Sequence, residues 1–323
     1  MPGLELVSVD AMAVYRGLDI GTETPRDCAA PWHLIDIVEP AEDFSVAEFQ
    51  AAARACLEGI HARGHRCVLV GGTGLYHRAV VDGLELPGRY PAARAVLEQE
   101  LAGSQELAGT QDSAGTQGPH SQDLRGSPQP AGLGALYERL SRLDPLAASR
   151  IEPGNVRRIL RALEVTVGSG RPYSSFGPGL RHYGDVPVAM AGLALDRAEI
   201  DRRLAARLES EIQAGFLEEV AALSARPGGL SRTARQAIGY GELLAVVEDG
   251  ASLATAKTII LKRLKSFARR QEAWFRRDPR VTWFPADDPR LADKVLDWWL
   301  GTAGAPGTVS FSARSVSWET ASK

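Results

Sequence analysis

Hydrophobic positions in the first part of the chain alternate between short apolar runs and stretches with helical spacing. Residues 4–9 (LELVSV) and 67–70 (CVLV) are apolar runs that predict buried strands. Apolar residues recur at helical intervals over 46–60, and a second helix is expected after the turn at 71–74. This order predicts a parallel sheet, in which ligands bind at the carboxyl ends of the strands. Asp10 and the 71–74 turn fall at those ends.

The middle of the chain departs from this pattern. Over 102–132 the hexapeptides AGSQEL, AGTQDS and AGTQGP follow one another, and Gly, Ser, Gln and Pro dominate. Such a composition cannot bury enough apolar surface to order itself, which predicts a disordered insert. Helical and strand patterns elsewhere predict a core of residues 1–84 and 186–300, a mostly helical insertion domain at 85–185, and a mobile tail at 301–323.

Length and composition are those of a globular protein of about two domains. The 323 residues are 44% hydrophobic and 24% charged. We expect no membrane span and no secretory signal, because the sequence has neither a long apolar run nor a basic, apolar leader. Three cysteines without CxxC spacing predict reduced thiols and a cytoplasmic location.

The net charge of −3 argues against a nucleic-acid partner, but the distribution of charge changes that conclusion. Nine basic and two acidic residues lie between Lys257 and Arg280, on a predicted helix, and such an excess is typical of a surface that binds a polyanion. Phe267, Trp274 and Phe275 on this helix favour core packing over base stacking. Only five residues are Lys, and the first is Lys257, which excludes a lysine-dependent mechanism in the first 256 residues.

Two features at the predicted strand ends have both a structural and a functional interpretation. Asp10 suits a turn or cap, the commoner use of a loop aspartate, or a general base that faces the ligand crevice. The 71–74 turn (GGTG) offers N–H groups and the Thr73 hydroxyl to an anion, or forms only a tight connection. It is neither a Walker A motif nor a GxGxxG fingerprint. The residue types alone leave these alternatives open.

Two groups of arginines are candidate phosphate ligands. Arg203 and Arg207 share a face of a predicted helix and could grip a diphosphate. With Arg202, they could instead form a solvated face paired with Asp201 and Glu211.

The second group, Arg157, Arg158 and Arg161, opens the helix predicted from Asn155. Positive charge is unfavourable there, because a helix N-terminus carries a partial positive charge of its own. This unfavourable placement favours phosphate groups as the partner.

Nine segments together resemble the tRNA dimethylallyltransferases, also called isopentenyl-tRNA transferases. They occur in the family's order and are interrupted mainly by the repeat insert. The matching segments are SVDAMAVYRGLDIGTETP (8–25), HLIDIVEP (33–40), FSVAEF (44–49), LVGGTGLYHRAVVDGL (69–84), DP (144–145), NVRRILRALEV (155–165), AGFLEEVAAL (214–223), QAIGY (236–240) and KRLKSFARRQEAWFRRDPRVTWF (262–284).

This resemblance implies an α/β fold with a P-loop-type parallel sheet as its core and a mostly helical insertion domain. It also implies that the core binds a nucleotide, ATP. It implies transfer of a dimethylallyl group from its diphosphate to N6 of adenosine 37 in the tRNA anticodon stem-loop, with Mg²⁺, by a cytoplasmic monomer. By motif position, Asp10 matches the base, and Thr73 and Arg207 match residues at the reacting centre and the diphosphate. The stretches that match tRNA contacts comprise Asp10, Ala11, Met12, Ala13, Thr73, Arg94, Arg157, Arg158, Ile159, Leu160, Arg161, Gln236, Ala237, Ile238, Gly239 and Tyr240.

The sequence also departs from the family pattern. The family's phosphate loop, GxTxxGK[ST], is expected about two dozen residues before Asp10. Met1 lies nine residues before Asp10, so we expect the loop, the first strand and the first helix to be missing. Asp10-Ala11-Met12-Ala13 replaces Asp-Ser-x-Gln, and Thr24 replaces a lysine. No Cys/His set matches the zinc finger of eukaryotic relatives, which indicates the bacterial form.

Two functions therefore remain open: an active transferase whose assigned start codon is too late, and a degenerate paralogue that binds tRNA and transfers nothing. A P-loop kinase would share the sheet, but it would not require the basic helix or the QAIGY segment. In-frame translation upstream of Met1 discriminates between the first two. A GxTxxGK[ST] segment would favour the active transferase, and a stop codon would favour the degenerate paralogue.

Overall fold

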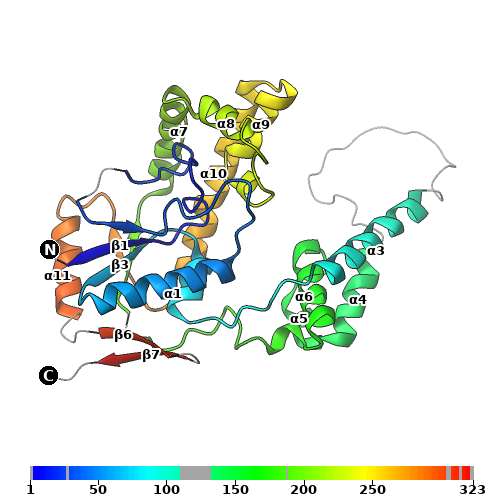
Figure 1. Cartoon of the computed structure of the whole chain (residues 1–323), viewed down its shortest axis with the longest axis horizontal. Coiled ribbons are helices and arrows are strands. Elements are labelled where there is room, and N and C mark those ends of the chain that lie inside the picture. The colour runs from blue at the N-terminus through cyan, green and yellow to red at the C-terminus, as the bar shows by residue number, and fades with distance from the viewer. Residues whose placement is uncertain are drawn as a thin grey trace. The chain divides into compact units, whose positions relative to one another are not determined.

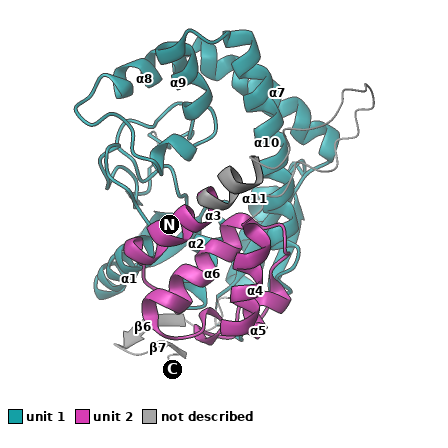
Figure 2. Cartoon of the chain, turned by 90° about the vertical axis from the view of Figure 1, so that its right-hand side faces the viewer, with its two compact units in different colours: residues 1–84, 183–323 teal, residues 85–182 magenta. Residues whose placement is uncertain are grey.

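The computed structural model describes residues 3–26, 29–109, 132–186, 188–302, 307–312 and 315–320. The chain divides into two compact units, drawn in different colours in Figure 2. Unit 1 comprises residues 1–84 and 183–323, and unit 2 comprises residues 85–182. Across the described residues, no helix is both long and apolar enough to cross a membrane.

Unit 1 contains a three-stranded parallel sheet in the order β2–β1–β3. Helix α1 packs beside β3 and against α2 (Figure 1). The chain runs from strand to helix to strand to helix, as the hydrophobic pattern predicts, and the α/β fold class is confirmed. The bounds are β1 (Leu4–Ser8), β2 (Trp32–His33), α1 (Val46–Ala62), β3 (Arg66–Val70) and α2 (Gly74–Val81).

Strands β4 (Met190–Ala194) and β5 (Val281–Pro285) form a separate parallel pair in unit 1. The sequence pattern predicts both strands, but it also predicts that the chain returns to the first sheet after the insertion domain. In the described part of the chain β4 instead pairs only with β5. Periodicity reveals that a segment is a strand, whereas the choice of partner depends on contacts between residues far apart in sequence.

The C-terminal segment, for which a mobile tail is predicted at 301–323, contains regular elements in its described part, and its mobility stays a prediction. The last two residues of α11 (Leu291–Thr302) belong to this segment. Strand β6 (Gly307–Ser312) pairs antiparallel with β7 (Ser315–Thr320). The alternation of polar and apolar residues in TVSFS and SVSWE is a strand pattern, which the Gly-, Ala- and Ser-rich composition of the segment conceals.

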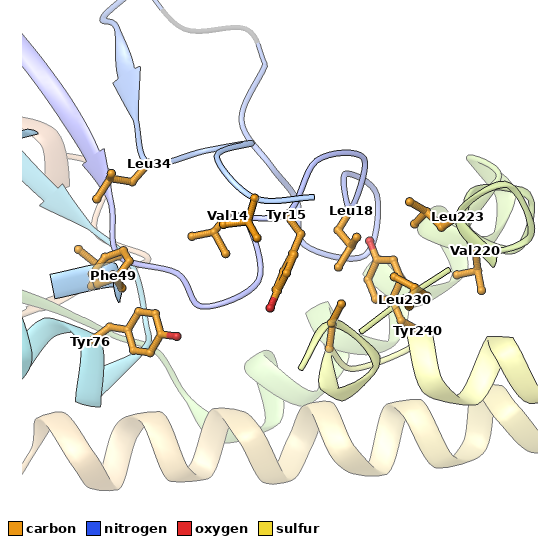
Figure 3. Packing of buried hydrophobic residues seen from close by; sticks show 14 of the residues in the cluster. Val14, Tyr15, Leu18, Leu34, Phe49, Tyr76, Val220, Leu223, Leu230 and Tyr240 are labelled. Atoms are coloured by element: carbon orange, nitrogen blue, oxygen red, sulfur yellow. The ribbon is translucent and has the colours of Figure 1, made fainter. Parts of the chain in front are cut away.

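The remaining helices of unit 1 enclose a continuous hydrophobic cluster. Figure 3 shows it extending from Phe49 and Tyr76, past Tyr15, to Tyr240. The rings of Phe49 and Tyr76 lie 4.5 Å apart, and those of Phe216 and Tyr240 lie 5.0 Å apart. The helices are α7 (Arg197–Gln213), α8 (Phe216–Ser224), η2 (Ala234–Gln236), α9 (Tyr240–Asp249) and α10 (Leu253–Phe275).

Unit 2 is helical and has a hydrophobic cluster of its own. The buried Asp144 caps α5 through the N–H of Ala147 and also binds Ser174, so the DP segment has a structural role. Residues 102–109 of the predicted disordered insert continue α3, and residues 110–131 lie outside the described part. The elements are α3 (Pro91–Gly109), α4 (Leu133–Leu143), α5 (Pro145–Arg150), α6 (Val156–Ser169) and η1 (Tyr173–Ser175).

Candidate active site

Asp10 and Thr73 lie at the carboxyl ends of neighbouring strands, β1 and β3. Beyond the strands, the N–H of Val9 donates to the Val70 carbonyl (2.8 Å), and the N–H of Thr73 donates to the Val9 carbonyl (3.4 Å). The N–H of Ala11 then donates to the Thr73 hydroxyl oxygen at 3.3 Å. The structure thus brings together two candidates that lie far apart in sequence.

The Asp10 carboxylate is held through one of its two oxygens. Oδ1 accepts hydrogen bonds from the N–H groups of Met12 (2.7 Å) and Ala13 (3.1 Å). Oδ2 accepts no hydrogen bond from any residue that the structure describes. The turn-forming and the general-base interpretations of Asp10 are therefore compatible, because a fixed carboxylate with a free oxygen can still take a proton.

Glycines in the 71–74 turn allow backbone and side chains to approach closely. A Cβ atom at Gly71 would collide with the Val9 carbonyl, and one at Gly74 would collide with the Trp274 ring. Thr73 is the N-cap residue of α2, but its side chain makes no cap hydrogen bond. Its hydroxyl oxygen instead accepts from Ala11, which leaves the hydroxyl proton available to an anion at the start of α2.

Arg207 is an ion-paired residue on α7. Its Nε donates to Glu211 (2.6 Å), and its Nη1 lies 2.7 Å from Glu23. Burial raises the pKa of Glu211, and the Arg207 guanidinium opposes that shift. Arg207 makes no hydrogen bond to Asp10 or Thr73 in the described part of the chain. The Glu211 partner expected in the alternative interpretation is therefore present, but Glu211 is buried rather than solvated, and the diphosphate role stays a prediction.

Arg202 and Arg203 differ from Arg207 in their partner. Both bind Glu199, at 2.7 Å, and their side chains are largely exposed. Asp201 pairs with Arg197 and Lys265 rather than with these arginines. Arg203 and Arg207 therefore have different carboxylate partners, and a diphosphate held by both stays a prediction.

Glu219 on α8 joins two segments that lie far apart in the sequence, the loop after β1 and the start of α9. Its Oε2 accepts from the N–H groups of Asp19 (3.2 Å) and Ile20 (2.8 Å), and its Oε1 accepts from the Tyr240 hydroxyl (2.6 Å). Burial raises the pKa of Tyr240, and the bond to Glu219 adds to the rise. Glu219 therefore ties the loop after β1 to the start of α9.

The predicted tRNA contacts at 236–240 lie at the start of α9 and directly before it. Ala237 and Tyr240 are buried in the core, and Gly239 packs against Phe216 at a positive φ of 99°. The side chains of Ala237 and Tyr240 therefore position the segment, and any contact with tRNA would come from its backbone or from Gln236 and Ile238. That role stays a prediction.

The basic segment of 257–280 divides into paired and unpaired cations. Five of its nine basic residues pair with carboxylates, for example Lys257 with Glu209 at 2.6 Å and Arg280 with Asp278 at 2.7 Å. Only the remaining four are without a carboxylate partner in the described residues. These unpaired cations are Lys262, Arg269, Arg270 and Arg277.

The unpaired cations on α10 share one face of the helix. Lys262 and Arg269 are seven residues apart, so they lie on one side, and Arg270 is adjacent to Arg269. All three are exposed. Free, exposed cations on one face are suited to a phosphate backbone. The predicted polyanion surface is therefore smaller than the charge count implies.

The candidate cations of unit 2 divide in the same way. Arg157 and Arg158 are exposed and, within the described residues, have no carboxylate partner. Arg161 binds Glu164 (2.7 Å) and the carbonyls of 87 and 88, and Arg94 binds Glu98 (2.6 Å). Arg161 and Arg94 therefore have structural partners, whereas Arg157 and Arg158 are free to meet phosphates.

Ile159 and Leu160 of the same predicted contact stretch are buried in the core of unit 2. Ala13 in unit 1 is buried as well, whereas Ala11 and Met12 are half-buried. The side chains of the buried residues cannot reach a ligand without rearrangement. Their assigned tRNA contacts stay predictions.

Sequence reasoning missed two residues that position the candidate site, Glu219 and Gln271. The amide of Gln271 donates to the Gly72 carbonyl at 3.1 Å, across 199 residues of sequence. Each is a polar residue on an amphipathic helix. The hydrophobic pattern does not distinguish such a residue from one that only faces solvent. Only their places within the matching segments AGFLEEVAAL and KRLKSFARRQEAWF could have drawn attention to them.

The chain is similar in sequence and fold to proteins of known name. A tRNA dimethylallyltransferase of Kineococcus radiotolerans is 42% identical over 303 residues, covering 92% of this chain and 86% of the relative. One of Nocardioides sp. is 41% identical over 295 residues, covering 90% and 86%.

The crystal structure of the full-length tRNA isopentenylpyrophosphate transferase from Bacillus halodurans has a TM-score of 0.59 at 31% identity, covering 92% of this chain and 88% of that chain. The model of the IPP transferase family matches residues 13–278. The matched region contains the 71–74 turn, Arg207 and α10. The chain therefore belongs to the IPP transferase family of prenyl-transferring enzymes.

Proposed function

We propose that the chain transfers a dimethylallyl group from its diphosphate to N6 of adenosine 37 in tRNA. The observation that carries this proposal is the juxtaposition of Asp10 and Thr73 at the carboxyl ends of β1 and β3, linked through Ala11. Relatives that are about 40% identical carry the name tRNA dimethylallyltransferase, and parallel sheets bind ligands at this edge.

Asp10 would act on the nucleophile. An adenine N6 is a poor nucleophile, so it needs a group that accepts its proton as the new C–N bond forms. Oδ1 of Asp10 is fixed by two backbone N–H groups, while Oδ2 has no partner among the described residues. This arrangement holds the carboxylate still and leaves one oxygen for the N6 proton. The adenine must leave the anticodon stack to reach it.

The leaving diphosphate would be stabilised by donors at the 71–74 turn and by Arg207. The Thr73 hydroxyl and the first N–H groups of α2 suit phosphate oxygens. Arg207 is held by Glu211 on one side, and on the other it faces Glu23, whose side chain is 59% exposed. A diphosphate would displace Glu23 and keep the Glu211 contact, because guanidinium–phosphate bonds are charge-assisted.

Mg²⁺ is the proposed cofactor and would neutralise charge on the diphosphate. In the described residues no group of three or more His, Cys, Asp or Glu side chains could hold a metal ion. The ion would therefore be held mainly by diphosphate oxygens. The neutral hydroxyl of Thr73 fits as a supporting ligand, because Mg²⁺ prefers oxygen donors and substrate phosphates.

The tRNA would be held by exposed cations that lack carboxylate partners. Among such cations we assign this role to Lys262, Arg269 and Arg270 of α10 in unit 1 and to Arg157 and Arg158 in unit 2. Together they would neutralise several backbone phosphates. Every group in this proposal comes from one chain, so a monomer suffices, and a tRNA substrate implies a cytoplasmic reaction.

A second candidate function is tRNA binding without transfer. The observation that favours it is the pairing of Arg207 with the carboxylates of Glu23 and Glu211. If this guanidinium stays paired, it does not hold the diphosphate, which predicts weak binding of dimethylallyl diphosphate and preserved binding of tRNA.

One assay separates these functions. The chain is incubated with Mg²⁺, labelled dimethylallyl diphosphate and an anticodon stem-loop RNA that carries adenosine 37. The matched control RNA carries guanosine 37. Label in the first RNA alone supports the transferase. RNA binding without label supports the second function, and a chain that binds neither RNA contradicts both.

A further inference from the structure

Helix α10 contacts the 71–74 turn through Gln271 and Trp274. The Nε2 of Gln271 donates to the Gly72 carbonyl at 3.1 Å, and a Cβ at Gly72 would collide with that amide. One helical turn along, the Trp274 ring fills the space that a Cβ at Gly74 would need. Gln271 and Trp274 therefore lie against Gly72 and Gly74, where an added Cβ would collide with them.

The contact continues along α2. The ring of His77 meets the ring of Phe275 edge-on, with centroids 5.8 Å apart. Burial lowers the pKa of His77, which favours the neutral imidazole. The first turn of α2 is thus packed against the last turns of α10 by aromatic contacts. Gln271 makes the polar contact at the other end, beside Thr73.

Gln271 contacts the peptide group next to Thr73. The Gly72 carbonyl belongs to the peptide group that immediately precedes Thr73, so a bond to this carbonyl restrains the plane of that peptide. The Thr73 hydroxyl meets the Ala11 N–H at 3.3 Å, a long contact that a small rotation of the turn would break. Arg269 and Arg270 precede Gln271 on the exposed side of the helix.

We propose that Gln271 is a positioning residue for the transfer reaction, which restrains the Gly72–Thr73 peptide and thereby aims the Thr73 hydroxyl at the reacting centre. The inference rests on the proposed function. In this role Gln271 acts through Thr73 rather than on the reacting atoms. It joins α10, which carries the exposed cations, to the turn, so that phosphate contacts with the helix bear on the geometry of the turn.

Gln271→Met tests this role, because methionine has a similar length and volume but no donor for the Gly72 carbonyl. The matched control is Thr258→Val, on the same helix. It removes a hydroxyl that donates to the Ala254 carbonyl at 3.0 Å, away from the turn. Both variants lose one side-chain bond to a backbone carbonyl.

Two readouts are taken on the full chain. The first is amide hydrogen exchange over residues 71–77, where Gln271→Met should exchange roughly tenfold faster, the scale of one lost hydrogen bond. The second is transfer, where kcat should fall roughly 10- to 100-fold with the KM for RNA changed less than about twofold, as for a misplaced reacting group. Thr258→Val should change neither, and the Tm of both variants should stay within about 2 °C of the parent.

The two readouts distinguish failure of this inference from failure of the proposed function. Unchanged exchange over 71–77 in Gln271→Met overturns the positioning role, whether or not the chain is active. Faster exchange with an unchanged kcat in an active parent overturns it as well. If the parent transfers nothing, the proposed function has failed, and the exchange measurement alone decides whether Gln271 restrains the turn.

Discussion

The backbone N–H of Ala11 donates to the Thr73 hydroxyl across 62 residues of sequence. This bond joins the residue that follows Asp10 to the N-cap of α2 and so links the two strand ends. The Thr73 side chain is therefore both a link within the site and a donor to any anion that binds there.

Removing this hydroxyl should lower the rate of transfer. Thr73→Val keeps the shape of the side chain but leaves the Ala11 N–H without its partner and the anion without a donor. We expect a fall in kcat of roughly 10- to 100-fold. Thr73→Ser, which keeps the hydroxyl, should stay within about threefold. Single-turnover kinetics measure both, and equal rates for Val and Ser would remove the hydroxyl from the mechanism.

The salt dependence of tRNA binding should identify the cations that meet phosphates. Arg269→Ala should reduce the slope of log K against log[salt] by roughly one, because one exposed, unpaired cation is lost. Lys257→Ala is the matched control on the same helix, since Lys257 already pairs with Glu209 at 2.6 Å. Its slope should remain close to that of the parent. Titrations at several salt concentrations test this, and equal slopes for both variants would contradict the assignment.

Glu5 should make the stability of unit 1 sensitive to acid. Hydrogen bonds from Arg63 outweigh burial and, with His65 and His33, lower the pKa of Glu5 from 4.5 to about 2. A carboxyl whose pKa is lower in the folded state stabilises the fold above its unfolded pKa. That stabilisation is fully present above about pH 5 and is lost as the pH falls toward 2.

Urea unfolding between pH 7 and pH 2 measures this effect. The midpoint of the parent should fall over that range more steeply than the midpoint of Glu5→Gln, which should already be less stable at pH 7. Parallel pH profiles would show that the Arg63–Glu5 contact contributes nothing to folding.

Part of the fold could be predicted because the signals are local. The apolar runs of β1 and β3 and the helical spacing of α1 lie within single segments, and the glycines of the 71–74 turn mark a break between two of them. The placement of Asp10 and Thr73 followed from the rule for strand ends in parallel sheets. The alternation of polar and apolar residues in TVSFS is a local signal as well, but the Gly-, Ala- and Ser-rich composition around it favours a tail over a strand.

The remaining features depend on contacts between distant residues. The pairing of β4 with β5 and the bond from Gln271 to Gly72 join segments about 90 and 199 residues apart. The count of cations in 257–280 could not reveal which of them have partners, because Glu209 and Asp82 come from other elements. Pattern alone carries no information on such pairs.

The most direct test of the proposed mechanism is single-turnover transfer by Asp10→Asn. Asparagine keeps an oxygen for the Met12 and Ala13 N–H groups, so the turn should stay intact, but it cannot accept the N6 proton. The rate should fall by roughly 10²- to 10⁴-fold, the scale of a general base. The affinity for tRNA and the melting temperature should match those of the parent. A rate within about threefold of an active parent would contradict the role of Asp10 as the base.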